Sequence, residues 1–141
     1  MTADDTHRFV TIDRVSNSHY TVTNPRGGTI AVGRGDGTDF TPVELLLAAI
    51  GGCTAVDVDL VTSRRAEPES FRVDVEATKV SDDQGHHLTD IAVTFKVVFP
   101  DSDGGEKARE VLPGIVRQSH ERLCTVSRTV EIGTPITTRI E

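Results

Sequence analysis

The chain has 141 residues, of which 36% are hydrophobic and 26% are charged, and its formal net charge is −7. This composition is typical of a globular protein, and the length predicts a single domain over residues 1–141. The negative charge argues against nucleic acid and anionic membrane surfaces as partners, since both attract clustered Lys and Arg. The sequence has no run of about 18 apolar residues and no signal-peptide pattern at its start, so we expect a cytoplasmic protein without a membrane partner.

Short β-type runs separated by turn signals fill the N-terminal third and predict a small antiparallel meander. The runs span residues 9–12, 20–23 and 29–32. A loop with Gly33, Gly35 and Gly37 follows. Because no helix begins directly after a strand here and no Lys follows, a flexible loop fits these glycines better than a phosphate site.

A long helix is predicted from about residue 41 to 65. Thr41 suits the N-cap, Pro42 suits the first helical position, and Glu44 completes a possible capping box. The helix opens with an all-apolar segment, LLLAAI, and such a helix is enclosed by protein. A helix of this length spans about 35 Å, more than one small chain covers easily, which favours a dimer.

The second half of the chain predicts further strands and helices. Alternating apolar residues indicate a hairpin over about 70–99, with a turn at 81–87. A helix is expected over about 105–123, with a kink or break near Leu112 because Pro113 and Gly114 interrupt it. A helical turn at 125–130 and a last strand at 136–140 complete the prediction.

The two cysteines are the candidate site. Cys53 lies inside the long helix after Gly51 and Gly52, and glycines in a helix interior cost about 1 kcal/mol each, which close approach of another group normally offsets. A small inert core residue is the plain alternative for Cys53. Cys124 begins the segment CTVS, which resembles a helix cap whose backbone N–H groups would face the sulfur and favour a thiolate.

Other chemistry for these residues remains open at this point. A structural disulfide is disfavoured in the cytoplasm, but a reversible one formed through a sulfenic acid is plausible. His120 and Cys124 are four residues apart and could join Cys53 around a metal, although such a pair arises easily by chance. His86 and His87 lie in a polar turn and are expected to face solvent. We predict neither a metal nor another cofactor.

Two segments carry a family resemblance. TPVELLLAAIGGCTAVDVDLV and, about 70 residues later, HERLCTVSRTVE resemble the OsmC/Ohr family of osmotically inducible and organic hydroperoxide resistance proteins. The GGC followed by AVDV is most similar to the YhfA-like branch. The resemblance implies an α+β fold, in which antiparallel sheets pack around a long buried central helix in an intertwined homodimer.

The resemblance also implies an activity. It points to a thiol peroxidase in which Cys53 attacks an organic hydroperoxide and Cys124 resolves the sulfenic acid to a disulfide. A dithiol reductant then reopens the disulfide, and a lipoyl-type dithiol is the candidate. The better-known peroxidases of the family add a Glu and an Arg that activate the first thiol. Here Val43 occupies the Glu position, and Glu44 one residue later projects from the opposite face of the helix to Cys53.

The activating arginine is not fixed by any motif. The candidates are Arg14, Arg26 and Arg128. The displaced carboxylate keeps a second function open, a non-enzymatic, redox-responsive or small-ligand-binding dimer of the same fold. A third hypothesis is an inert dimer with structural thiols.

Overall fold

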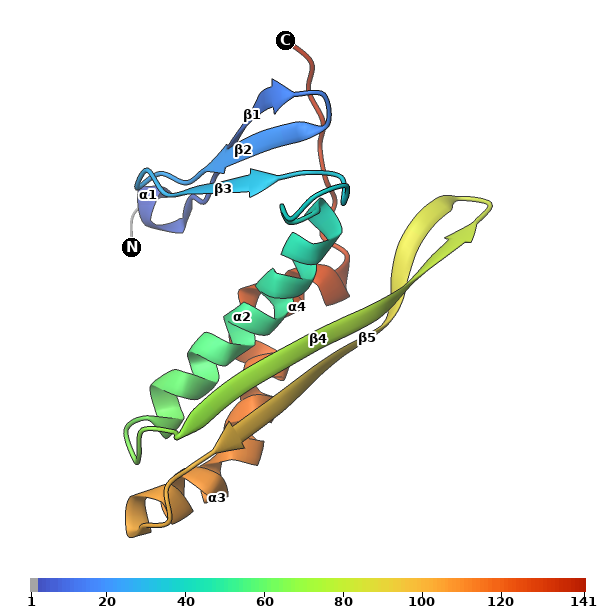
Figure 1. Ribbon diagram of the computed structural model, residues 1–141. Helices are drawn as coiled ribbons and strands as arrows, with labels where there is room; N and C mark the ends of the chain where they lie inside the picture. Colours follow the sequence, from blue (N-terminus) through green and yellow to red (C-terminus); the bar gives the residue numbers. More distant parts are fainter. Residues whose placement is uncertain (1–2) are drawn as a thin grey trace. The chain divides into compact units, whose positions relative to one another are not determined.

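The computed structural model describes residues 3–141 (Figure 1). The chain is an α+β protein with two antiparallel sheets. It divides into two compact units, one ending at Leu46 and the other running from Leu47 to Glu141. The boundary falls within the first turns of helix α2 (Pro42–Thr62). The single domain expected over residues 1–141 stays a prediction.

The first unit contains the predicted meander. Its elements are the short helix α1 (Ala3–Thr6) and the strands β1 (Thr11–Ser16), β2 (His19–Thr23) and β3 (Thr29–Val32). The strands pair antiparallel in the order β1-β2-β3. β1 begins two residues later than predicted and continues to Ser16, because its length is set by pairing with β2 through a tight turn in which Ser18 has a φ of 63°.

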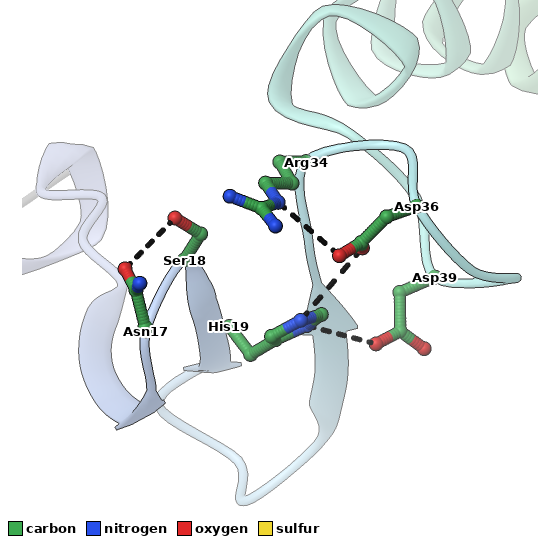
Figure 2. A network of polar contacts seen from close by, with 6 residues as sticks. All are labelled: Asn17, Ser18, His19, Arg34, Asp36 and Asp39. Atoms are coloured by element: carbon green, nitrogen blue, oxygen red, sulfur yellow. Dashed lines mark hydrogen bonds and ion pairs between the residues drawn. The ribbon is translucent and has the colours of Figure 1, made fainter.

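The glycine loop after β3 is tied by exposed polar contacts, as Figure 2 shows. The His19 ring lies 3.7 Å from Asp36 and 3.9 Å from Asp39. The hydrogen bond from Arg34, 3.1 Å long, holds the pKa of Asp36 below its ordinary value. Exposed pairs of this kind contribute little to stability, so the network orders the loop locally and carries no chemistry of its own.

Helix α2 begins with the predicted capping box. The Thr41 N–H donates to Glu44 Oε1 at 2.8 Å, and the Glu44 N–H donates to Thr41 Oγ1 at 3.2 Å. The Thr41 N–H, and next the Thr41 side chain, hold the pKa of Glu44 below its ordinary value, because hydrogen bonds to the carboxylate favour its ionised form. Glu44 therefore acts as a helix cap, as its position in the sequence predicted.

The described residues cover one face of α2 and leave another exposed. The buried positions follow one side of the helix: Ile50, Gly51, Thr54, Val58 and Thr62. Val56 and Leu60 are 60% and 58% exposed. Among the described residues, α2 is also the one helix long and apolar enough to cross a membrane by length and composition, a test that the core helix of a soluble protein passes as well.

The hairpin of β4 (Ser70–Asp82) and β5 (Gly85–Val98) lies alongside α2 (Figure 1). Its apolar face is built from opposed pairs that include Val73 with Phe95 and Val75 with Val93. The strands extend further than predicted, and the turn is only two residues, 83–84. The polar residues of the expected turn pair across the hairpin, because a long antiparallel ladder tolerates polar side chains where it faces solvent.

Three helical segments follow, α3 (Asp103–Gln118), the π-helical turn η1 (Ser119–Leu123) and α4 (Thr125–Ile132). Of the kink or break expected near Leu112, the break is wrong, since α3 runs through Pro113 without interruption, and the kink stays a prediction. Pro113 and Gly114 are exposed, so the carbonyl that loses its partner can bond to water. The irregularity lies about two turns later, in η1, directly before Cys124.

The strand expected at 136–140 is also wrong. That segment forms no strand, and Ile136 and Ile140 are 92% and 97% exposed. A strand requires a neighbour for its backbone N–H and C=O groups, and within the described residues this segment has none. The helical turn predicted at 125–130 is confirmed as part of α4.

Candidate active site

Cys53 lies in the middle of α2 and is half-buried. Gly51, two residues before Cys53, explains part of the GGC pattern. A Cβ at Gly51 would collide with the Val75 side chain on β4, so the helix and the hairpin approach closely at this point. This contact is the close approach that the sequence predicted, whereas a Cβ at Gly52 would meet nothing within 4 Å.

Cys124 occupies a different setting, at the junction of η1 and α4. It is fully buried, and its sulfur caps α4 by accepting a hydrogen bond of 3.3 Å from the Ser127 N–H. The first N–H groups of a helix have no partner within the helix and carry partial positive charge. The cap that the CTVS segment predicted is therefore confirmed, and it favours a negative sulfur.

The pKa values of the two thiols move in opposite directions. Burial raises the pKa of Cys53, and the neighbouring Cys124 and Asp57 raise it further, against a hydrogen bond from the Val126 N–H. Burial also acts to raise the pKa of Cys124, but hydrogen bonds with Ser127, Thr54 and Cys53 outweigh it and bring the pKa below its ordinary value. The surroundings of the pair therefore favour the negative charge on Cys124 over Cys53.

Both cysteines are free thiols in the structure. The interaction between them favours the proton on Cys53 and the charge on Cys124. This arrangement suits a pair of thiols that share one proton, with the proton on Cys53, the less buried residue of the two.

Two polar residues beside the pair were missed in the sequence. Asp57 lies one turn after Cys53 on α2 and accepts a 2.7 Å hydrogen bond from Ser119 Oγ at the start of η1. Ser119 is fully buried. A carboxylate four residues after a cysteine in a mostly apolar helix was a usable signal for Asp57, but nothing in the sequence pointed to Ser119.

A cavity of about 530 Å³ is lined in part by Thr54 and Ser127, which are neighbours of the two cysteines, although neither cysteine lines it. Ile50 and Thr54 of α2, three apolar residues of β5 and the helical segments after it line this cavity, which is mostly apolar. Thr54 and Ser127 line it and also hydrogen bond to Cys124. The cavity therefore borders the polar groups that hold the sulfur, and its volume is within the usual range for a small-molecule site.

The metal alternative finds no support in the arrangement of its ligands. His120 lies 3.2 Å from Glu131, and its side chain is exposed. In the part of the chain that the structure describes, no group of three or more His, Cys, Asp and Glu residues could hold a metal ion.

The candidate arginines lie in three different elements. Arg14 is on β1, and Arg26 is in the turn before β3. Arg128 lies on α4 with an exposed side chain, and its N–H donates to the Cys124 carbonyl. Assignment of an activating arginine stays a prediction.

The family model of OsmC-like proteins matches residues 35–139, which include both cysteines and most of the described elements. The chain belongs to the OsmC-like family. Uncharacterized proteins of Mycobacterium tuberculosis and Mycobacterium bovis are 26% identical to it over 126 residues, which cover 89% of this chain and 90% of theirs. Placement in the YhfA-like branch stays a prediction.

Solved structures share the OsmC-like fold. An OsmC-like protein of unknown function from Vibrio cholerae is 14% identical with a TM-score of 0.73, over 89% of this chain and 94% of that one. The organic hydroperoxide resistance protein OhrB of Bacillus subtilis is 21% identical with a TM-score of 0.53, over 88% and 90% of the two chains. At these identities the likeness establishes the fold and not the activity.

Proposed function

We propose that this OsmC-like protein is a thiol peroxidase that reduces organic hydroperoxides with Cys53 and Cys124. The observation that carries the proposal is the paired setting of the two sulfurs, with a half-buried thiol on α2 that interacts with a buried, helix-capping sulfur at α4. Fold relatives from Bacillus subtilis and Legionella pneumophila that are named organic hydroperoxide resistance proteins support the substrate class.

Cys53 is the attacking residue in this proposal because its sulfur is the more accessible of the two. The deprotonated Cys53 sulfur attacks the distal oxygen of the hydroperoxide, the O–O bond breaks, and the alcohol leaves after taking up a proton. Cys53 is then a sulfenic acid. The reaction moves two electrons from sulfur to the peroxide.

Cys124 completes the cycle as the resolving residue. Its thiolate attacks the Cys53 sulfur, an S–S bond forms, and the sulfenic hydroxyl leaves as water after protonation. Because the helix cap and its neighbours favour the charged sulfur, Cys124 is ready to attack as soon as the sulfenic acid forms. A dithiol reductant of the lipoyl type then reduces the disulfide by thiol–disulfide exchange and supplies the two electrons.

The cavity lined by Thr54 and Ser127 suits an apolar substituent on the hydroperoxide. Ile50, Ile91 and Phe95 are among its apolar lining residues. An alkyl group placed there would leave water for the protein interior, which favours binding in proportion to the area buried. Hydrogen peroxide gains nothing from this contact and is expected to be the poorer substrate.

A homodimer in the cytoplasm is part of the proposal. Val56 and Leu60 leave an apolar stripe of α2 exposed, and an exposed apolar face on a long helix is costly in water. A second copy of the chain would cover it. Leu60→Glu is expected to reduce the mass seen in sedimentation from that of two chains to that of one; a wild-type protein sedimenting as one chain would contradict the dimer.

A coupled assay tests the peroxidase. It should use an alkyl hydroperoxide or hydrogen peroxide as oxidant and a lipoyl-type dithiol as donor. Wild type is expected to turn over the alkyl hydroperoxide faster. Cys53→Ser should reduce the rate to the uncatalysed level, and Cys124→Ser should accumulate oxidised Cys53, visible by mass spectrometry. Full turnover by Cys53→Ser would overturn the assignment of roles.

One observation favours a second candidate, a redox-responsive dimer without turnover. The raised pKa of Cys53 leaves little attacking thiolate at neutral pH. In that case peroxide would still produce a Cys53–Cys124 disulfide, detected by mass spectrometry, but the coupled assay would show no sustained consumption of the reductant.

A further inference from the structure

A side-chain hydrogen bond away from the sulfurs also connects the two segments that carry the cysteines. Ser119 Oγ donates to Asp57 Oδ2 at 2.7 Å, although the residues are 62 positions apart in the chain. Asp57 lies one helical turn after Cys53 on α2, and Ser119 begins the turn η1 that ends next to Cys124. Ser119 is fully buried, so the bond is sheltered from competing water.

Ser119 also holds Cys124 directly, through the backbone. The Cys124 N–H donates to the Ser119 carbonyl at 2.8 Å, a bond that spans five residues and closes the π-helical turn. Isolated π turns are uncommon and often occur at functional sites. This one ends the preceding helix with Cys124 in an extended conformation, which is what allows its sulfur to cap α4.

The two bonds form one continuous connection from α2 to Cys124. The Asp57 carboxylate fixes the Ser119 side chain, and the Ser119 carbonyl fixes the Cys124 backbone. A hydrogen bond to a charged group contributes more than one between neutral groups, and the carboxylate is half-buried. Without it, the buried Ser119 hydroxyl would lose its partner.

We propose that Asp57 is a positioning residue of the dithiol, which acts through Ser119 and the turn η1 to keep Cys124 facing Cys53. The inference rests on the proposed function, because the step that Asp57 assists is closure of the Cys53–Cys124 disulfide. Asp57 touches neither the peroxide nor the reacting atoms in this role. Its negative charge has a second effect, because it raises the pKa of Cys53 and so helps to keep the proton on that thiol.

Glutathione equilibrium measures the positioning without any peroxide. Oxidised glutathione takes two electrons from the pair, the Cys53–Cys124 bond forms, and two molecules of reduced glutathione are released. The equilibrium constant gives the effective concentration of one thiol toward the other, which depends on how well the two are held. Because the readout does not involve a hydroperoxide, it can support the inference even if the protein proves not to be a peroxidase.

Four variants make the test specific. Asp57→Ala and Ser119→Ala should each lower the effective concentration about tenfold, the change expected from loss of one charge-assisted hydrogen bond. Asp57→Asn keeps an oxygen acceptor for Ser119 and should stay within about threefold of wild type, while it lowers the pKa of Cys53 by removing a like charge. Asp59→Ala removes the next carboxylate on α2, which is exposed, and should change neither quantity.

The double variant separates positioning from a general loss of structure. If Asp57 acts through Ser119, Asp57→Ala combined with Ser119→Ala should lower the effective concentration no further than either change alone. Additive losses would overturn the inference. So would an Asp57→Ala protein with the wild-type effective concentration, or an Asp57→Asn protein that loses as much as Asp57→Ala.

Discussion

Cys53 and Cys124 have the same side chain but occupy different positions on two different helices, one in the interior of α2 and the other at the N-terminus of α4. Cys53 sits in a helix interior, where the local backbone N–H groups are already bonded, and it is half-buried beside the Asp57 carboxylate. Cys124 sits at a helix N-terminus, where the Ser127 N–H is free to bond to its sulfur. The first position favours the thiol and the second favours the thiolate.

The difference shows that burial alone does not set the state of a cysteine. Cys124 is the more deeply buried of the two, yet its pKa is the one below the ordinary value. Burial penalises the charged sulfur at both positions, but only at Cys124 do the surrounding donors outweigh it. The proposed cycle uses both properties, an accessible attacker and a charged resolver.

The largest expected effect is the difference between the pKa values of Cys53 and Cys124, each titrated in the variant that lacks the other thiol. Cys53→Ser keeps a hydroxyl donor beside Cys124, so the thiolate absorbance near 240 nm should appear at a pH below the ordinary cysteine value of about 8.5. In Cys124→Ser the absorbance should appear above that value, because burial still penalises the Cys53 thiolate. The reverse order would break the comparison.

The reaction with hydroperoxide should show the same separation. Below the pKa of Cys53 its thiolate fraction rises about tenfold per pH unit, so single-turnover oxidation of Cys124→Ser should accelerate into the alkaline range. A rate already constant at pH 7 would show that another group, such as a partner subunit's arginine, activates Cys53 in the assembled protein.

A smaller effect is expected from the two glycines before Cys53. Gly51→Ala forces a methyl group against Val75 and should lower the free energy of unfolding by about 1–3 kcal/mol in urea titration. Gly52→Ala is the matched control, since nothing lies within 4 Å of the added carbon. Better helix propensity should stabilise it by up to about 1 kcal/mol.

The stability of Gly52→Ala also tests whether another chain packs against this side of α2. A destabilised Gly52→Ala protein would mean that another chain packs against this side of α2, which is the surface the proposed dimer would cover. An unchanged Gly51→Ala protein would instead contradict the close contact between α2 and β4.

Local signals in the sequence predicted much of this structure. The capping box at Thr41, the alternation in the hairpin and the cap at Cys124 each depend on residues within a few positions of one another, and all three are confirmed. The resemblance to OsmC-like proteins, carried by the two cysteine segments, is confirmed by the family match.

The failures involve information that is distant along the chain. The expected strand at 136–140 had a β-type composition but finds no partner strand within residues 3–141, and composition does not reveal pairing. Pro113 lies on an exposed side of α3, and the sequence could not show which side would face solvent. The Asp57–Ser119 bond joins residues 62 positions apart, so no local pattern predicts it.

The smallest effect concerns the hydroxyl of Ser127. Ser127→Ala removes the side-chain donor and keeps the N–H that caps Cys124, so the pKa of Cys124 should rise toward its ordinary value without losing the whole shift. One such bond contributes about 1 kcal/mol, which corresponds to less than a tenfold change in thiolate population. Thr129→Ala is the control, because that hydroxyl bonds to the Thr125 carbonyl instead of to sulfur. Thiolate absorbance in the Cys53→Ser background measures both variants, and equal titrations would show that the Ser127 hydroxyl contributes nothing to the shift.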